Sequence, residues 1–265
     1  MEKNSIQILD CTLRDGGYYT NWDFSSELVK KYMVAMQELP VDILELGYRS
    51  KPQKEYNGRY FYFPDFVIDQ VCKLNSKKIL ALMFNEKDTR PEDLDYLLEG
   101  LQGKISLIRL AIDPTKLERA ILLGEAIKNR GFGVAFNLMY MSKYYQDQSF
   151  LSKLSKLNDF VDYLNLVDSY GGMLPNQVKE LVENTKINCK VKIGFHGHNN
   201  LELAFANALA GFDAGCDIVD TTIMGMGRGA GNLKTELLLT HLASKGMVDF
   251  DFNALSGLIE AWSPL

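Results

Sequence analysis

Residues 191–223, VKIGFHGHNNLELAFANALAGFDAGCDIVDTTI, contain the pattern that decides the fold. Two apolar runs, 191–196 and 218–223, flank a segment, 201–212, whose apolar residues recur at helical spacing. Near-continuous apolar runs are typical of parallel strands that are buried on both faces, and a crossover helix joins such strands. The stretch therefore predicts a strand, a helix and a second, parallel strand.

The same alternation recurs along the whole chain. Eight apolar runs rich in β-branched residues are separated by helical stretches, and they lie at residues 6–10, 42–46, 79–84, 105–112, 133–138, 163–167, 191–196 and 218–223. Eight strand–helix units in 265 residues predict one α/β domain, residues 1–265, folded as a (β/α)8 TIM barrel. An open doubly wound sheet is the alternative, but no GxGxxG follows the first run, which argues against its dinucleotide-binding version.

Some helix boundaries carry specific predictions. Apolar residues at helical spacing predict a helix over 28–39. Asn199 or Asn200 is expected to cap the helix over 201–212, and Thr115 to cap a helix that ends near Gly131.

Composition excludes several classes of partner. The formal net charge of −5 argues against nucleic acid, which needs a surplus of Lys and Arg. No run of about 18 apolar residues is present, so no membrane span is expected. The polar start, Met1 to Ser5, argues against a signal peptide. Four scattered cysteines without CxxC spacing are typical of thiols in a reducing cytoplasm, where we expect the protein to be located.

Residues able to hold a metal follow the first and seventh runs. Active sites of (β/α)8 barrels lie where strands end. His196 and His198 stand at i and i+2 on an extended strand, so their side chains point to the same side, and Asp15 can add an oxygen from the first strand end. This set suits a divalent ion such as Mn, Mg, Co, Zn or Fe. The alternative is a polar surface pair or a capping network.

Further polar residues at the strand ends are candidates for substrate binding. The glycine-rich loop after the eighth run, with Gly227 and Gly229, lets backbone amides approach an anion. Asn232 is either a fourth metal ligand or a helix cap. Arg14 either clamps a carboxylate and stabilises an enolate or braces the barrel mouth. Other candidates, of which the first is either an interior brace or a neighbour of the metal, are Glu45, Arg49, Asp168 and Ser169.

Three motifs together resemble the DRE-TIM metallolyases. They are Asp10-x-Thr-Leu-Arg-Asp-Gly16, His196-Gly-His-Asn-Asn200 and Gly225-Met-Gly-x-Gly-Ala-Gly-Asn232. The sequence is most similar to the aldolase domain of 4-hydroxy-2-oxovalerate aldolase, and less so to isopropylmalate and homocitrate synthases and to 3-hydroxy-3-methylglutaryl-CoA lyase.

The resemblance implies a metal, held by residues matching Asp15, His196 and His198, that chelates the ketone and carboxylate of a pyruvate-like unit. In some members the position of Asn232 supplies a ligand. It also implies that Arg14 steadies the enolate formed when the carbon–carbon bond opens. The expected substrate is therefore a small keto acid.

The sequence departs from this family in its general base. Where the aldolases have a catalytic histidine, this chain has Tyr18, and an ordinary phenol with a pKa of about 10 is a weak base at neutral pH. Tyr19 or a metal-bound water are the alternatives. The lyase's catalytic cysteine in the glycine-rich loop is also missing, which argues against that activity.

The aldolases carry a C-terminal helical region that contacts an aldehyde dehydrogenase partner. The sequence ends at Leu265 without it, so we expect either a fragment of a longer protein or no such partner. A homo-oligomer remains open. The loops over 49–62 and 140–145, rich in aromatic and cationic residues, are expected to select the substrate, to form a lid or to make a subunit contact.

The leading functional prediction is a metal-dependent carbon–carbon lyase acting on a 4-hydroxy-2-oxo acid. A Claisen-type synthase that joins an acyl-CoA to a keto acid is one alternative. A Schiff-base aldolase using Lys192 or Lys78 is another, and a catalytically silent barrel that binds a metabolite or a partner protein is the third.

Overall fold

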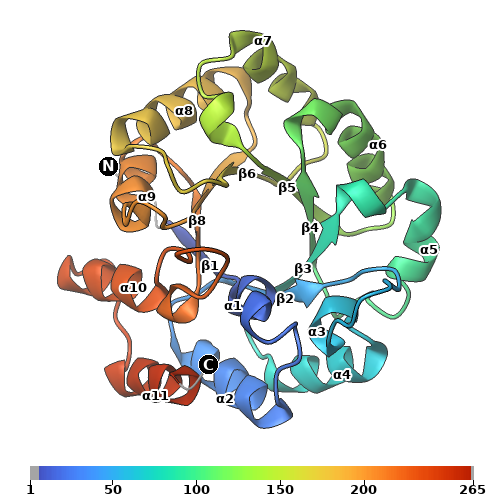
Figure 1. The fold of residues 1–265 in the computed structure, drawn as a ribbon, viewed down its shortest axis with the longest axis vertical. Helices are drawn as coiled ribbons and strands as arrows, with labels where there is room; N and C mark the ends of the chain where they lie inside the picture. The colour runs from blue at the N-terminus through green and yellow to red at the C-terminus, as the bar shows by residue number, and fades with distance from the viewer. Residues whose placement is uncertain (1–5, 264–265) are drawn as a thin grey trace.

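Eight parallel strands close into a barrel in the order of the chain, so that β1 pairs with both β2 and β8. Figure 1 shows the ring of strands with the helices outside it. The computed structural model describes residues 6–263, so the expectations on Met1 to Ser5 and on Leu265 lie outside the described residues. The strands are β1 Gln7–Asp10, β2 Ile43–Tyr48, β3 Ile79–Asn85, β4 Leu107–Ile112, β5 Gly133–Leu138, β6 Tyr163–Asp168, β7 Lys192–Gly197 and β8 Ile218–Thr221. This architecture confirms the predicted (β/α)8 barrel.

The strand interiors are buried on both faces, as their apolar composition predicts. Every residue of β2 is buried, and so are five of the six residues of β4. One apolar layer lies between the strands and the helices, and a smaller cluster fills the barrel interior around Leu9, Ala81, Ala135 and Ile218. Parallel strands covered by crossover helices require this double burial.

The helices alternate with the strands as expected. They are α1 Thr12–Asp15, α2 Ser26–Glu38, α3 Arg59–Tyr62, α4 Asp65–Leu74, α5 Leu94–Leu97, α6 Leu117–Lys128, α7 Gln148–Leu151, α8 Pro175–Asn188, α9 Ala204–Asp213, α10 Thr235–Ser244 and α11 Phe252–Trp262. The last helix, α11, lies beside α2 (Figure 1), and Trp262 meets the ring of Tyr32 edge-on at 5.7 Å.

Two cap predictions are wrong in detail. Thr115 does not cap its helix, because Asp113 accepts the hydrogen bond of the Thr115 amide at 2.9 Å and a short 3-10 turn precedes α6. The helix after β7 begins at Ala204 rather than next to Asn200. Asn199 still satisfies the helix start, since its Oδ1 accepts the hydrogen bond of the Ala204 amide at 3.1 Å.

Within residues 6–263 no helix is both long and apolar enough to cross a membrane.

Candidate metal centre

A short helix at the end of β1 places the first candidate ligand. Asp10, the last residue of β1, accepts a hydrogen bond from the Thr12 amide at 2.9 Å and so starts α1. The other carboxylate oxygen of Asp10 accepts a hydrogen bond from the Thr235 hydroxyl at 2.6 Å. Asp10 thus ties the start of α1 to the start of α10, and Arg14 and Asp15 at the other end of α1 are buried.

The end of β7 brings two imidazoles to the same place. His196 and His198 are buried, and their ring centroids lie 5.0 Å apart. One ligand atom from each of them and one from Asp15 lie within 4.8 Å of one another. The structure therefore brings together the three side chains that the sequence analysis selected as metal ligands.

Hydrogen bonds behind the two rings fix which nitrogen faces the centre. His196 Nδ1 lies 3.0 Å from Asp220 Oδ2, and its Nε2 lies 3.5 Å from Asp15 Oδ2. His198 Nδ1 donates to the carbonyl oxygen of Asp168 at 3.0 Å, which leaves Nε2 buried without a hydrogen-bond partner. Metal-binding histidines are ordinarily held in this way by a carboxylate or a backbone carbonyl.

Asn232 completes the group of donors. Its Nδ2 donates to Asp15 Oδ2 at 2.8 Å and to the carbonyl oxygen of Met226 at 3.1 Å. Its Oδ1 is buried without a partner, like Nε2 of His198. A buried acceptor left unpaired is costly, so two such atoms beside a carboxylate fit a cation that would satisfy all three. The residues present therefore fit a divalent metal.

The electrostatics favour the ligand forms of these side chains. Burial alone would raise the pKa of Asp15, but the Arg14 guanidinium and His196 hold it well below its usual range. Burial and the neighbouring His196 lower the pKa of His198 to about 4, so its ring is neutral at neutral pH. Metal ligation requires an ionised carboxylate and a neutral imidazole.

A chain of buried charges supports the centre from inside the barrel. Arg14 Nε donates to Glu45 at 2.8 Å, and Arg109 bridges Glu45 at 3.0 Å and Asp220 at 2.5 Å. Asp220 in turn holds His196. Glu45 thus makes the hydrogen bond with Arg14 that the first of its two predicted roles requires. The sequence analysis missed Arg109 and Asp220, although a charged residue inside each apolar run was the available signal.

The glycine-rich loop serves mainly to position Asn232. Gly231 has a φ of +82°, and a Cβ there would lie 2.0 Å from the carbonyl oxygen of Gly225. A Cβ on Gly227 would lie 2.4 Å from the amide nitrogen of Asn232. The loop therefore folds tightly around Asn232, and neither Gly227 nor Gly229 lines the cavity beside the candidate ligands.

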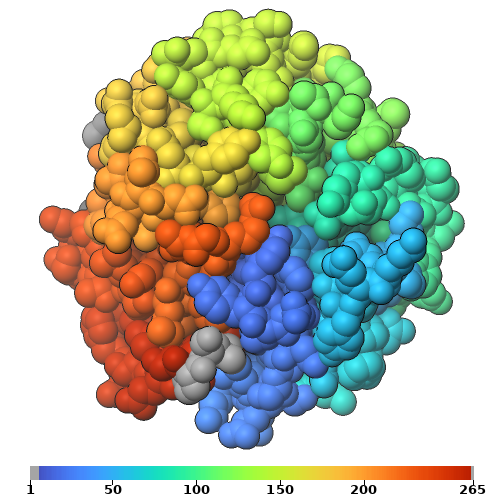
Figure 2. Space-filling model, in the orientation of Figure 1, coloured from blue at the N-terminus to red at the C-terminus, as the bar shows by residue number. Residues whose placement is uncertain are grey.

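A cavity of about 380 Å³ opens at the barrel mouth beside the three candidate ligands. Figure 2 shows a hollow near the centre of this face, where the blue N-terminal segment meets green and orange segments. Of the residues predicted from sequence, those that line the cavity are Arg14, Asp15, Tyr18, Ser169, His196 and His198.

Two predicted substrate-binding residues lie elsewhere. The Arg49 guanidinium donates to the carbonyl oxygens of Leu97, Phe63 and Glu99, away from the cavity. These hydrogen bonds hold the guanidinium against the residues at the ends of α3 and α5, so the side chain does not reach the cavity. The Asp168 carboxylate accepts from the amides of Gly172 and Met173 and so shapes its own loop. Of the two predicted specificity loops, only the one after β5 lines the cavity, through Tyr140.

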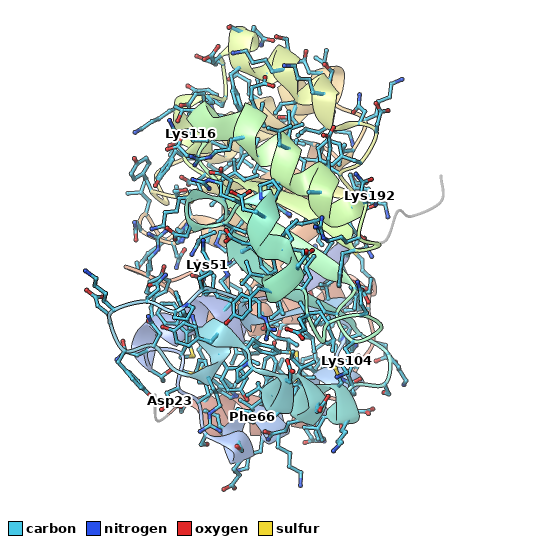
Figure 3. All side chains as sticks on the ribbon, turned by 90° about the vertical axis from the view of Figure 1, so that its right-hand side faces the viewer. Asp23, Lys51, Phe66, Lys104, Lys116 and Lys192 are labelled. Carbon is cyan, nitrogen blue, oxygen red and sulfur yellow. The ribbon has the colours of Figure 1, made fainter. Side chains whose placement is uncertain are left out.

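Several cavity residues escaped the sequence analysis. Most of them lie at or just after a strand end, which was the signal available, whereas Arg119 lies inside α6. They include Tyr48, Glu86, Lys87, Lys116, Arg119 and Arg228. The lysines proposed for a Schiff base are not among them. Figure 3 shows Lys192 at the end of the barrel opposite Lys116, and Lys78 donates to the carbonyl oxygen of Leu39 just before β3. The structure therefore does not support the Schiff-base alternative.

This arrangement is that of a barrel enzyme with a candidate metal centre at its strand ends, and comparison with known proteins gives its family. The HMGL-like family matches residues 113–259. An oxaloacetate decarboxylase of Mycobacterium tuberculosis is 29% identical over 92% of this chain and 73% of that protein. A 4-hydroxy-2-oxovalerate aldolase of Geobacillus genomosp. 3 is 30% identical over 93% of this chain and 73% of that protein.

A solved structure gives the same result. The N-terminal domain of an aldolase candidate from Bacteroides vulgatus superposes with a TM-score of 0.95 at 50% identity, covering 98% of this chain and 86% of that one. The chain therefore belongs to the HMGL-like family, within the DRE-TIM metallolyases, which confirms the resemblance drawn from its motifs. It is accordingly an enzyme of the carbon–carbon lyase class.

Proposed function

We propose that the protein is a metal-dependent aldolase that cleaves a 4-hydroxy-2-oxo acid into pyruvate and an aldehyde. The observation that carries the proposal is the convergence of Asp15, His196 and His198 at one wall of the cavity. Asn232, which donates to Asp15, has a buried Oδ1 without a partner. A divalent cation held there would act as a Lewis acid toward the keto and carboxylate oxygens of the substrate. The names of the relatives support the same reaction class.

We assign stabilisation of the enolate to Arg14. Its Nη1 lies 2.8 Å from Asp15, and its Nε donates to Glu45, so the guanidinium is fixed on two sides. Among the described residues none accepts a hydrogen bond from its Nη2, and Arg14 lines the cavity. A preorganised donor facing a developing oxyanion lowers the barrier to its formation.

Two tyrosines are available for proton transfer. Tyr18 is 44% exposed, and the Arg228 guanidinium lies 5.7 Å from its ring centroid. Tyr48 is buried, and burial raises the pKa of its hydroxyl well above the usual range, so it stays a hydrogen-bond donor.

We assign the proton transfer of the cleavage step to Tyr18. Its phenol oxygen would accept the proton of the C4 hydroxyl while its own proton passes to water. The C3–C4 bond would break, the electron pair of that bond would form the enolate, the aldehyde would leave, and water would return a proton. Protonation at C3 then gives pyruvate.

Replacing the two tyrosines separately tests this assignment. Tyr18→Phe is expected to lower kcat for aldol cleavage by roughly 10²-fold, the scale of general base catalysis. Tyr48→Phe removes only a hydrogen-bond donor and is expected to lower kcat by about tenfold. The rate of hydrogen–deuterium exchange at the pyruvate methyl, measured by NMR, separates enolate formation from cleavage. Equal effects of both variants on kcat would contradict the assignment.

Metal removal tests the function itself. Treatment with a chelator is expected to abolish both aldol cleavage and pyruvate exchange, and Mn²⁺ is expected to restore them, because Lewis-acid polarisation is lost and regained. Adding Mg²⁺, Co²⁺ or Zn²⁺ to the same apoprotein ranks the metals. Release of free CoA from acetyl-CoA and a keto acid would instead support the synthase alternative. Cleavage of oxaloacetate without any aldolase activity would make the protein a decarboxylase.

A further inference from the structure

The cavity has a second wall whose charge the proposed chemistry does not use. In the closed barrel β3 and β4 lie across the ring from β7 and β8, as Figure 1 shows for the labelled strands. The candidate metal ligands lie at or after the ends of β7, β8 and β1. The opposite wall, formed after β3 and β4, contributes Glu86, Lys87, Asp113, Lys116 and Arg119 to the cavity.

This wall has three cationic side chains and two carboxylates, and both carboxylates already accept hydrogen bonds from protein groups. Asp113 accepts hydrogen bonds from the amide and hydroxyl of Thr115. Glu86 is only 2% exposed and pairs with Arg119 through two contacts, one of them between Nη2 and Oε2 at 2.9 Å. Glu86 thus orients Arg119 along the cavity wall through Nε and Nη2, and no group within residues 6–263 accepts a hydrogen bond from its Nη1. An arginine held in this way can bind an anion through its remaining donor.

Lys116 adds a charge that no protein group in the described residues neutralises. Its backbone amide bonds to Asp113, while its side chain takes part in no ion pair among residues 6–263. It precedes the twelve-residue helix α6 and stands at the mouth end of the barrel, where Figure 3 shows it. Lys116 and Arg119 therefore lie one turn apart and present positive charge to the same cavity.

The size of the cavity leaves room for a longer substrate. About 380 Å³ is within the range of roughly 300–1,000 Å³ that holds drug-sized ligands. A five-carbon hydroxy-keto acid is much smaller than such ligands. With its keto acid at the metal wall, a longer chain would reach toward the cationic wall.

We propose that the substrate carries an oxyanion, a carboxylate or a phosphate, at the end remote from its keto acid, and that Lys116 and Arg119 bind this group. This inference rests on the proposed aldolase function and narrows its substrate class. In the direction of synthesis, C3 of the pyruvate enolate attacks the carbonyl carbon of an anionic aldehyde. The carbonyl π bond breaks, and its oxygen takes up a proton.

Matched aldehydes test the proposal in the Mn²⁺-loaded full chain with pyruvate. One pair is propanal and succinic semialdehyde, and the other is D-glyceraldehyde and D-glyceraldehyde 3-phosphate, so the two pairs distinguish carboxylate from phosphate. We expect kcat/KM to be at least about tenfold higher for the anionic member of one pair, which is the scale of a charge-assisted contact. Equal kcat/KM within both pairs would overturn the proposal.

Single variants locate the effect. Lys116→Gln is expected to lower kcat/KM for the preferred anionic aldehyde by about 10- to 100-fold and to change that for its uncharged partner by less than about twofold. Lys192→Gln, at the opposite end of the barrel (Figure 3), is the control and should change neither. An equal loss for both aldehydes in Lys116→Gln would overturn the assignment. If the protein catalyses pyruvate methyl exchange but shows no preference for the anionic aldehydes, only this inference is wrong. If it catalyses no exchange, the proposed aldolase function is wrong as well.

Discussion

Asp15→Ala is expected to abolish stoichiometric metal binding and to lower aldolase activity by at least roughly 10³-fold. The carboxylate is the proposed ligand on the β1 side of the centre, and it also accepts the hydrogen bond that orients Asn232 at 2.8 Å. Lewis-acid catalysis contributes several kcal/mol, and each 1.36 kcal/mol is a factor of ten in rate. Elemental analysis of the purified variant, together with aldol cleavage kinetics, gives the measurement.

Two further variants separate loss of the metal from loss of the fold. His198→Gln removes a ligand nitrogen without removing a charge, and it should lose metal in the same way. Asp23→Ala removes an exposed carboxylate near the barrel mouth, whose contacts are Tyr56 and Arg59, and it should retain the metal. Full metal occupancy in folded Asp15→Ala, as judged by circular dichroism, would refute the assignment of the centre.

Arg109→Met is expected to destabilise the folded protein by about 3–5 kcal/mol, the range found when one partner of a buried ion pair is removed. Arg109 is fully buried and lies between Glu45 and Asp220. Without it, two carboxylates stay inside the barrel with one fewer cation between them. Urea unfolding followed by circular dichroism measures the change in the free energy of unfolding.

An exposed ion pair supplies the matched control. Lys156→Met breaks the contact with Glu118, whose side chain is 69% exposed, and it should cost less than about 1 kcal/mol. A loss that small in Arg109→Met would show that the interior charges do not depend on one another. A loss of about 3–5 kcal/mol in Arg109→Met with the metal affinity unchanged would instead limit Arg109 to a structural role.

The fold could be predicted almost completely from the sequence, because each strand is a short apolar run and each run ends in polar residues. The boundaries were less accurate where local hydrogen bonds decide them. The helix after β7 begins at Ala204, because the Asn199 side chain satisfies that amide from five residues away. Asp113 took the capping role expected of Thr115 for a similar reason.

Site residues could be predicted from the sequence only where their position at a strand end was enough to select them. Asp15, His196 and His198 could be selected because strand ends of a barrel meet at one mouth. The partners inside the barrel could not, since Arg109 meets Asp220 only through the closing of the ring, 111 residues apart in sequence. Arg49 was misplaced because its backbone carbonyl partners lie in segments whose relative position the sequence does not reveal.

The seam between β1 and β8 has a consequence for how the molecule is assembled. Cys11 donates to the carbonyl oxygen of Thr221, 210 residues later, and Thr235 bonds back to Asp10. During synthesis β1 is made before the other strands, yet its second neighbour, β8, emerges only after about 210 further residues. Until then both β1 and β7 expose unpaired backbone, the feature that drives edge-to-edge aggregation. Any shortened form that ends before β8 would keep those edges open permanently.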